Sequence, residues 1–319
     1  MNEVKAAKHL GQHFLRDEAV IARLLAVINA KAGERILEIG PGLGALTLPL
    51  LRQIGALMAV EYDPRVLAPL AKKAAPLGAL NLIHADILDI NFGELLAAES
   101  PTDMPPLPVE EGRGVDNSTD EPLSLWERGW GEGEKIARGG GSKHPAPATR
   151  PAPQKLRLVG NLPYNLSSPI LFHCLAQREH IHDMHYMLQK EVVDRITAAP
   201  GSKTYGRLSL MAQLWCETTA LFDIPPDAFE PPPKVDSAVV RLVPRAAPAW
   251  QIDDLATFEE TVRLAFAQRR KMLRKTFAHW MSESELKALD IDPTARAETL
   301  DGAAFARLAN ARYQQERQQ

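Results

Sequence analysis

Residues 38–44, Glu38-Ile39-Gly40-Pro41-Gly42-Leu43-Gly44, decide the fold of this chain. They begin at the end of a short, mainly apolar run at residues 35–39. They lead into an apolar stretch at residues 45–53 that suits a helix. Glycines between a buried strand and a helix let the backbone turn tightly and approach a ligand closely. Such a ligand lies at the helix N-terminus and at the carboxyl end of a parallel sheet.

The alternation of strand and helix continues on both sides of this stretch. Asp17 is placed to cap a helix whose apolar residues recur at positions 20, 21, 24, 25 and 28. Pro64 occupies the first position of another helix, after a strand at residues 56–61. Further strands are predicted at residues 81–84, 156–160, 184–188, 218–224 and 238–243. Elements of these lengths predict an α/β fold with βαβ units on a parallel sheet.

Two regions depart from this pattern. Residues 99–154 hold nine of the 25 prolines and eight of the 20 glycines and have no apolar periodicity, which predicts a low-complexity, disordered insertion without an assigned function. From residue 244 onward only helices are predicted, at residues 258–280, 283–289 and 301–312. The expected division is residues 1–98 and 155–243 as one domain, residues 99–154 as the insertion, and residues 244–319 as a small helical domain.

Composition limits the class of protein. A chain of 319 residues with 45% hydrophobic and 24% charged residues is typical of a globular protein of about two domains. No stretch approaches the roughly 18 apolar residues that a membrane span needs, and the N-terminus resembles no targeting signal. We therefore expect a cytoplasmic protein with no membrane partner. Cys174 and Cys216 lie in apolar patterns that indicate core residues, and the run HIHDMH at residues 180–185 lacks a convincing fourth metal ligand, so no metal is expected.

The charge of the chain is unevenly distributed. The net charge is −3, but residues 99–154 carry ten acids against six bases, so the rest of the chain is close to neutral. Residues 263–275 contain six basic residues and no acid. On a predicted helix at residues 262–280, this basic patch favours contact with nucleic-acid phosphates, whereas a solvated helix face is the alternative.

Two carboxylates follow the glycine-rich turn at the ends of successive strands. Glu61 comes 21 residues after Gly40 and can accept hydrogen bonds from both hydroxyls of a ribose. Asp86, after the next strand, can accept a bond from an exocyclic amino group. Together they predict a pocket for a cofactor that contains adenosine, either NAD(P) or S-adenosylmethionine. Glu38 favours S-adenosylmethionine, because an acid before the first glycine suits a cationic amino-acid group.

The tetrapeptide Asn161-Leu162-Pro163-Tyr164 follows the fourth predicted strand directly. If the Asn161 side-chain oxygen and the Leu162 carbonyl accept both N–H bonds of an adenine N6 amine, the nitrogen lone pair turns toward the methyl donor. Pro163 fixes its own φ and holds these oxygens in place, and Tyr164 can stack on a flipped base. The alternative is a turn in which Asn caps and Pro stiffens the end of a strand.

Seven motifs in this order resemble those of one family. They are GQHFL at residues 11–15, EIGPGLG at 38–44, NLPYN at 161–165, MLQKEVV at 187–193, YGRLS at 205–209, FEPPPKVDS at 229–237 and QRRK at 268–271. The family is that of the bacterial small-subunit (16S) rRNA adenine N6,N6-dimethyltransferases, the KsgA/RsmA family. The likeness covers essentially the whole chain except residues 99–154.

The resemblance implies a fold, a reaction and a partner. The fold is a class I S-adenosylmethionine-dependent methyltransferase (Rossmann-like) sheet with a small all-helical C-terminal domain. The enzyme dimethylates two adjacent adenosines in the 3′-terminal hairpin of 16S rRNA within an immature 30S subunit. It uses S-adenosyl-L-methionine without a metal and acts as a monomer.

The resemblance also assigns residues. The cofactor-binding residues are His13, Leu15, Gly40, Glu61, Asp86 and Asn161. The residues at the target base are Asn161, Leu162, Pro163, Tyr164 and Phe229, with Phe229 as a second stacking ring opposite Tyr164. Contacts to rRNA are expected from Arg269, Arg270, Lys271 and Arg274.

Three other functions stay open at this point. A 23S rRNA methyltransferase that confers macrolide resistance shares the chemistry, but the helical tail and the MLQKEVV and FEPPPKVDS motifs favour the small-subunit enzyme. A ribosome-assembly factor with secondary catalysis would tolerate loss of Asn161 or Glu61. An NAD(P)-dependent oxidoreductase is disfavoured by residues 161–164.

Overall fold

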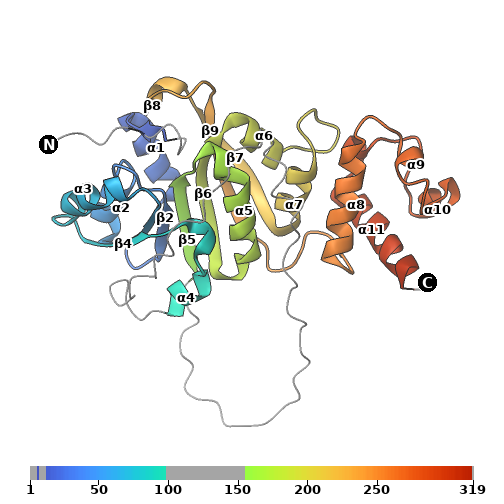
Figure 1. Ribbon diagram of the computed structural model, residues 1–319, viewed down its shortest axis with the longest axis horizontal. Coiled ribbons are helices and arrows are strands. Elements are labelled where there is room, and N and C mark those ends of the chain that lie inside the picture. Colours follow the sequence, from blue (N-terminus) through green and yellow to red (C-terminus); the bar gives the residue numbers. More distant parts are fainter. Residues whose placement is uncertain (1–5, 7–11, 98–154, 318–319) are drawn as a thin grey trace, which may run out of the picture.

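The centre of the protein is a seven-stranded sheet. The computed structural model describes residue 6 and residues 12–97 and 155–317. The strand order is β4-β3-β2-β5-β6-β9-β7 (Figure 1). The strands are β2 (Ile36–Ile39), β3 (Ala56–Glu61), β4 (Ala79–His84), β5 (Leu156–Asn161), β6 (Ile181–Gln189), β7 (Cys216–Ile224) and β9 (Ser237–Pro244). The first five strands in that order are parallel, β9 pairs antiparallel with β6, and β7 pairs antiparallel with β9. The predicted α/β fold is confirmed, with an antiparallel extension that the prediction of a parallel sheet did not include.

Helices cover both faces of the sheet. Helices α1 (Glu18–Ile28), α2 (Thr47–Ile54) and α3 (Pro64–Ala74) contribute to one buried apolar cluster, and α4 (Phe92–Ala97), α5 (Ser167–Ala176) and α6 (Lys190–Ile196) contribute to another. Neighbouring strand residues alternate between the two clusters, as Ile36 and Leu37 do. Since successive side chains of a strand point to opposite faces, the sheet is the middle of three layers.

Aspartates set the starts of several helices. The Asp17 carboxylate accepts a hydrogen bond from the Val20 amide at 2.9 Å, and the Asp63 carboxylate accepts one from the Arg65 amide at 3.0 Å. Asp301 caps α11 (Gly302–Glu316) in the same way. These side chains satisfy amides that have no partner within the first helical turn. The predicted cap at Asp17 is confirmed, as is the position of Pro64 at the start of α3.

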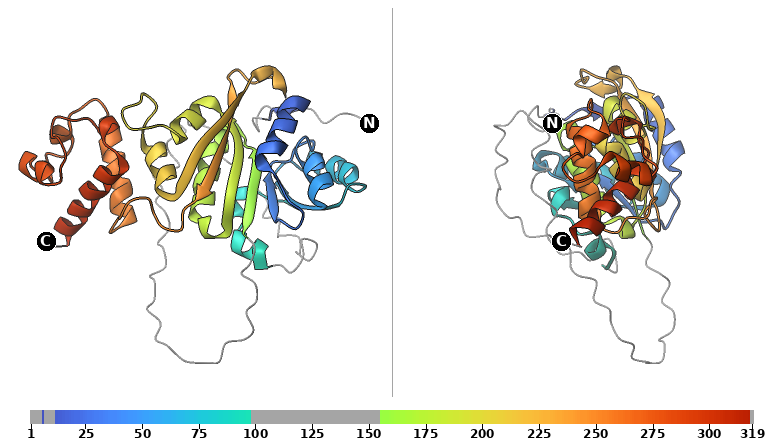
Figure 2. Two further views of the ribbon diagram at one scale, coloured as in Figure 1. Left: turned by 180° about the vertical axis from the view of Figure 1, so that it is seen from behind. Right: turned by 90° about the vertical axis from the view of Figure 1, so that its right-hand side faces the viewer.

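The C-terminal helices lie at one end of the molecule, opposite the end formed by α3 and β4 (Figures 1 and 2). They are α8 (Leu255–Ala267), α9 (Leu273–Thr276), α10 (Glu283–Ala288) and α11. Their apolar cluster also includes Leu210 and Leu214 of α7 (Arg207–Trp215), so the C-terminal helices share a core with α7. No helix in the described part of the chain is both long and apolar enough to cross a bilayer.

The single helix predicted over residues 258–280 is wrong. Helix α8 ends at Ala267, and the chain turns before α9 begins at Leu273. The Lys271 amide donates to the Gln268 carbonyl within this turn, and the Leu273 amide donates to the Ala295 carbonyl at 2.9 Å. The break therefore comes with a contact to a distant segment, which the apolar spacing of residues 262–280 does not reveal.

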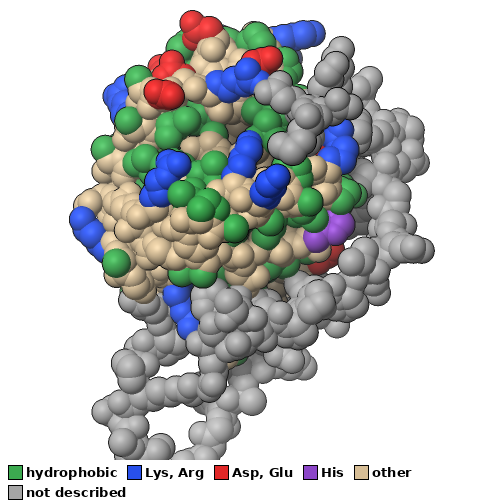
Figure 3. All heavy atoms as spheres, turned by 90° about the vertical axis from the view of Figure 1, so that its left-hand side faces the viewer, with side chains coloured by type: hydrophobic (Ala, Val, Ile, Leu, Met, Phe, Trp, Pro, Cys, Tyr) green, Lys and Arg blue, Asp and Glu red, His purple; other side chains and the backbone are tan. Residues whose placement is uncertain are grey.

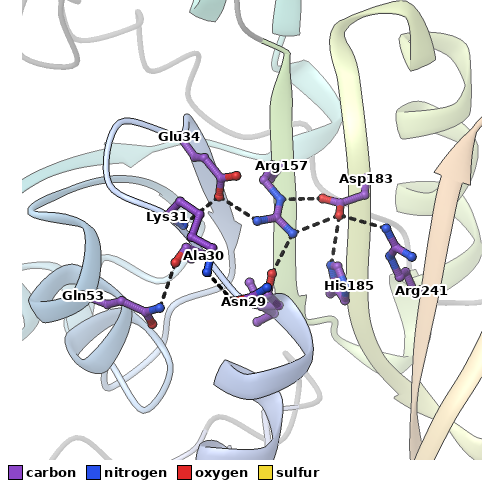
Figure 4. Close-up of polar contacts among 10 residues, drawn as sticks. Asn29, Ala30, Lys31, Glu34, Gln53, Arg157, Asp183, His185 and Arg241 are labelled. Atoms are coloured by element: carbon purple, nitrogen blue, oxygen red, sulfur yellow. Dashed lines mark hydrogen bonds and ion pairs between the residues drawn. The ribbon is translucent and has the colours of Figure 1, made fainter.

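A buried arginine ties four segments together at the start of β5 (Figure 4). Arg157 donates two hydrogen bonds to Asp183 of β6, at 2.8 and 2.9 Å. It also donates to Glu34, before β2, and to the carbonyl of Ile28, the last residue of α1, both at 2.7 Å. Arg157 is 8% exposed and Asp183 is 1% exposed. This network fixes α1 and β2 against β5 and β6.

Candidate functional site

The glycine-rich turn after β2 brings its backbone next to the tetrapeptide after β5. Gly40 has φ +68°, and a Cβ at this position would lie 3.7 Å from the Asn161 carbonyl oxygen. Gly44 has φ +90°, and a Cβ there would lie 2.7 Å from the Leu70 side chain. Both residues have a positive φ, which glycine adopts at low cost. The two motifs that the sequence predicted separately therefore meet at one edge of the sheet.

Glu61 ends β3 and is held by backbone amides. Its Oε2 accepts from the Gly42 amide at 3.1 Å and its Oε1 accepts from the Asp63 amide at 2.8 Å. Burial raises the pKa of Glu61, although these bonds oppose the shift. Each carboxylate oxygen can accept a second hydrogen bond. A pair of vicinal hydroxyls therefore finds a carboxylate that is already fixed in place.

Asp86 follows β4 and caps the short turn Ile87–Asp89. Its Oδ1 accepts from the Leu88 amide at 2.9 Å. Its other oxygen makes no hydrogen bond to any residue in the described ranges, and the side chain is partly exposed. This oxygen can accept a bond from an amino group.

Glu38 is the buried acid of the glycine motif. It is 3% exposed, and its Oε2 has no hydrogen-bond partner among the described residues. Burial, with a smaller contribution from the neighbouring Glu61 carboxylate, raises the pKa of Glu38 to about 8. A buried carboxylate oxygen without a partner is costly, so a cationic group placed here would favour the charged form of Glu38. The residues thus fit the amino-acid, ribose and adenine parts of S-adenosylmethionine.

The tetrapeptide after β5 is held by contacts to three other segments. The Asn161 Nδ2 donates to the His13 carbonyl at 2.9 Å, and the side-chain oxygen has no hydrogen bond to another described residue. The Leu162 amide donates to the Met187 carbonyl of β6 at 3.2 Å. The Tyr164 hydroxyl lies 2.6 Å from the Ser237 hydroxyl at the start of β9. The arrangement presents an oriented amide oxygen at the edge of the sheet.

The N-terminal segment lies across this edge. Strand β1 (Phe14–Leu15) pairs antiparallel with β8 (Phe229–Glu230). The His13 Nδ1 is 2.6 Å from the Pro231 carbonyl, and the His13 ring stacks on Tyr164 with 5.5 Å between ring centroids. His13 therefore contacts both residue 161 and residue 164, and one face of the Tyr164 ring is covered by an imidazole.

Phe229 and Leu15 are both core residues. They are 3% and 5% exposed, respectively, and lie opposite each other in the β1–β8 pair. Both belong to the apolar cluster that α1 and α2 share. The stacking role of Phe229 stays a prediction, because its side chain is buried in this structure.

The predicted rRNA-binding residues divide into two kinds. Arg269 forms an ion pair with Glu298 at 2.7 Å, and Arg274 forms one with Glu283 at 3.1 Å. The side chains of Arg270 and Lys271 are exposed and make no ion pair within the described ranges. The turn between α8 and α9 thus presents Arg270 and Lys271 to solvent, whereas the other two arginines stabilise the helical region.

A second basic surface lies at the opposite end of the molecule, over α2 and α3. Lys and Arg side chains are spread across this face (Figure 3). The exposed charged residues of α2 and α3 are all basic: Arg52, Arg65, Lys72 and Lys73. An adjacent acid, Asp63, is buried and bonded to Arg65, which lowers the pKa of Asp63 to about 2. The face is therefore compatible with a polyanion.

Two features of the sequence have no role at this edge. Among the described residues, no group of three or more His, Cys, Asp and Glu side chains could hold a metal ion. Of the histidines at 180–185, His185 is buried beside Asp183, and burial lowers its pKa to about 4. Cys174 and Cys216 are fully buried, and burial raises the pKa of each thiol to about 12, which confirms them as core residues.

Two contacts of the site have no sequence signal. The His13 contact to Asn161 is made by a backbone carbonyl, which any residue carries. Ser237 lies 73 residues after Tyr164, and only the sheet register brings their hydroxyls together. Serines at the start of a strand are common, so neither contact could be found from residue types and spacing.

The fold and this site define a class of protein. A Rossmann-like sheet carries a glycine-rich turn and acids after successive strands, and an Asn-Leu-Pro-Tyr edge lies beside them. This is the arrangement of an S-adenosylmethionine-dependent methyltransferase.

Comparison with known proteins identifies the family. The family described as ribosomal RNA adenine dimethylase matches residues 3–314, and the chain belongs to it. A relative from Dichelobacter nodosus, named ribosomal RNA small subunit methyltransferase A, is 53% identical over 99% of both chains. A protein of the same name from Xanthomonas euvesicatoria is 46% identical over 96% of this chain and 95% of the relative.

Solved structures support the fold. A dimethyladenosine transferase from Plasmodium falciparum has a TM-score of 0.63 at 21% identity and covers 93% of this chain and 96% of its own. The 23S rRNA methyltransferase ErmE has a TM-score of 0.62 at 22% identity, with coverages of 94% and 98%. The fold class and the family resemblance predicted from the motifs are confirmed.

Proposed function

We propose that this enzyme transfers methyl groups from S-adenosylmethionine to N6 of two adjacent adenosines in the 3′-terminal hairpin of 16S rRNA, giving N6,N6-dimethyladenosine. It acts as a monomer in the cytoplasm on an immature small subunit. The names of the relatives support the small subunit as the substrate, and the family supports dimethylation of adenine.

The observation that carries this proposal is the fixed orientation of Asn161. Because its Nδ2 donates to the His13 carbonyl, its Oδ1 is held ready to accept an N–H bond from a target amine. The Leu162 carbonyl accepts the second N–H bond. The amine nitrogen then keeps its lone pair out of the ring system and attacks the methyl group, S-adenosylhomocysteine leaves, and one N6 proton passes to solvent. The second transfer starts from an amine with one N–H bond left, which one of the two oxygens accepts. Positioning of this kind supplies rate without a strong general base.

The chain also holds the residues that the methyl donor requires. Glu61 would hold the ribose hydroxyls, Asp86 the adenine amino group, and Gly40 would lie along the amino-acid part, flanked by His13 and Leu15. When bound, S-adenosylmethionine supplies an electrophilic methyl group. The unpartnered oxygen of Glu38 supports this assignment, because it offers a buried acceptor near the expected cationic group.

Recognition of rRNA is assigned mainly to the turn between α8 and α9. Of the four predicted residues, Arg270 and Lys271 form no ion pair within the described protein. We therefore place the phosphate contacts at these two side chains. Arg269 and Arg274 act indirectly, by holding the turn against Glu298 and Glu283.

The test is transfer of labelled methyl groups to small ribosomal subunits that lack the modification, followed by mass analysis of the nucleosides. The intact chain is compared with a variant lacking residues 99–154. Dimethyladenosine from both proteins supports the proposal and leaves residues 99–154 without a role in catalysis. If both proteins bind S-adenosylmethionine but neither transfers a methyl group, the proposal is wrong and an assembly factor is the better description.

A further inference from the structure

Ser237 places its hydroxyl against the tip of the Tyr164 side chain, 2.6 Å from the phenol oxygen. Ser237 is fully buried, and its backbone lies in the sheet opposite Gln189 of β6 on one side and Ile224 of β7 on the other. Because strands on both sides hold the Ser237 backbone, Ser237 does not shift if the Tyr164 side chain moves. The Ser237 hydroxyl is therefore a fixed point at the edge of the site.

The main chain at Tyr164 is anchored, but this does not fix the far end of the Tyr164 side chain. Tyr164 begins the 3-10 turn Tyr164–Leu166, which runs directly into α5, and the Ser167 hydroxyl donates to the Pro163 and Tyr164 carbonyls at 3.2 Å. The phenol oxygen lies beyond two rotatable side-chain bonds, so its position depends on other contacts. The Tyr164 ring is only half-buried, and the His13 ring covers one of its faces. His13 limits rotation of the ring, whereas Ser237 fixes the position of its hydroxyl end.

We infer that Ser237 is a positioning residue for methyl transfer, which holds the Tyr164 ring where it receives the target base. The inference rests on the proposed function, in which Tyr164 stacks on the adenine. Burial raises the pKa of Tyr164, with the Ser237 bond opposing the shift, so the phenol stays protonated near neutral pH. The two hydroxyls therefore remain a neutral hydrogen-bonded pair under the conditions of catalysis.

A double-mutant cycle tests this inference. Ser237→Ala and Tyr164→Phe each remove the same hydrogen bond from one side. Methyl transfer to unmodified small subunits gives kcat/KM, and equilibrium titration gives the Kd of S-adenosylmethionine. We expect each single variant to lower kcat/KM roughly three- to tenfold, with the cofactor Kd unchanged. The double variant should lose no more than either single variant, because the bond can be removed only once.

Either of two results overturns the inference. Wild-type kcat/KM in Ser237→Ala shows that the hydroxyl does not position the ring. A double variant whose loss equals the product of the two single losses shows that Ser237 acts through the packing of β9 and independently of the Tyr164 hydroxyl. If Ser237→Ala does not fold, Tyr164→Phe alone decides, and wild-type kcat/KM in that variant refutes the inference.

Two further variants separate this inference from the proposed function. Ser209→Ala is the matched control. Ser209 lies in α7 and is also fully buried, and its hydroxyl donates a hydrogen bond to the carbonyl of Arg195 in α6. We expect it to keep wild-type kcat/KM. Tyr164→Ala removes the ring itself. If Tyr164→Ala is strongly impaired but Ser237→Ala is not, only the inference fails. If Tyr164→Ala is fully active, the stacking role in the proposed function fails as well.

Discussion

Replacement of Arg157 by Met is expected to cost about 3–5 kcal/mol of stability, the range measured when one partner of a buried ion pair is removed. The Arg157 side chain donates four hydrogen bonds, two to Asp183 and one each to Glu34 and the Ile28 carbonyl. Methionine retains the aliphatic stem but none of the donors. Asp183 is then a carboxylate that is 1% exposed and has lost its main partner. For a chain of this size, the loss corresponds to a fall in Tm of roughly 5–10 °C.

The cost should depend on pH in a defined direction. Burial alone raises the pKa of Asp183, but the bonds and charge of Arg157 outweigh it, so the folded pKa lies below the ordinary value of 3.8. In the wild type, Asp183 therefore contributes stability above pH 3.8, and this is lost as pH falls through the folded pKa. In Arg157→Met, nothing offsets burial, and the pKa of Asp183 is raised. The free energy of unfolding of this variant therefore falls as the pH rises through that pKa. The difference between the two proteins should be largest near pH 7 and shrink toward pH 4.

Thermal unfolding followed by circular dichroism at pH 7 and pH 5 measures both effects. Arg157→Met/Asp183→Leu is the informative companion, because replacing both members of a buried pair by apolar groups is often close to neutral. We expect this double variant to recover at least half of the lost Tm at pH 7. A loss below 1 kcal/mol in the single variant, a loss independent of pH, or no recovery in the double variant would refute the reasoning.

Three further changes test the site. Asn161→Ala should lower kcat roughly 100-fold or more in the methyl-transfer assay, because it removes the oriented acceptor; a loss below threefold would contradict this role. Gly160→Ala places a Cβ 2.4 Å from the Ile39 carbonyl oxygen, so it should lower stability by about 3 kcal/mol in urea unfolding, and an unchanged midpoint would show that the sheet adapts. Arg270→Gln/Lys271→Gln should reduce the slope of log K against log salt for rRNA binding by about 1.4–1.8, and an unchanged slope would place the phosphate contacts elsewhere.

Local chemistry made much of the sheet predictable. The strand at residues 56–61 and the helix start at Pro64 coincide with the structure, because a fully buried apolar run ends at an acid and an Asp-Pro pair starts the next helix. The helix predicted over residues 258–280 failed for the opposite reason. Its apolar spacing continues past Ala267, whereas the turn after it involves a hydrogen bond from Leu273 to Ala295.

The residue types of the site were predictable from the sequence, whereas the hydrogen bonds that orient its side chains were less so. Acids at strand ends and the glycine turn indicate a nucleoside pocket, because parallel strands end at the same edge of a sheet. The contacts that orient Asn161 and Tyr164 come from a backbone carbonyl and from a serine on a distant strand. Such contacts depend on chain topology, and a single sequence carries no local signal for them.

The pairing of β1 with β8 also bears on how the protein is made. His13 and its partner Pro231 are 218 residues apart, a distance that a ribosome takes about 10–45 s to translate. Strands β2 to β6 are complete before Phe229 is synthesised, so the nascent chain can build most of its sheet while the N-terminal segment has no partner strand. The segment that carries His13 therefore stays without its partner strand until more than two thirds of the chain has been made.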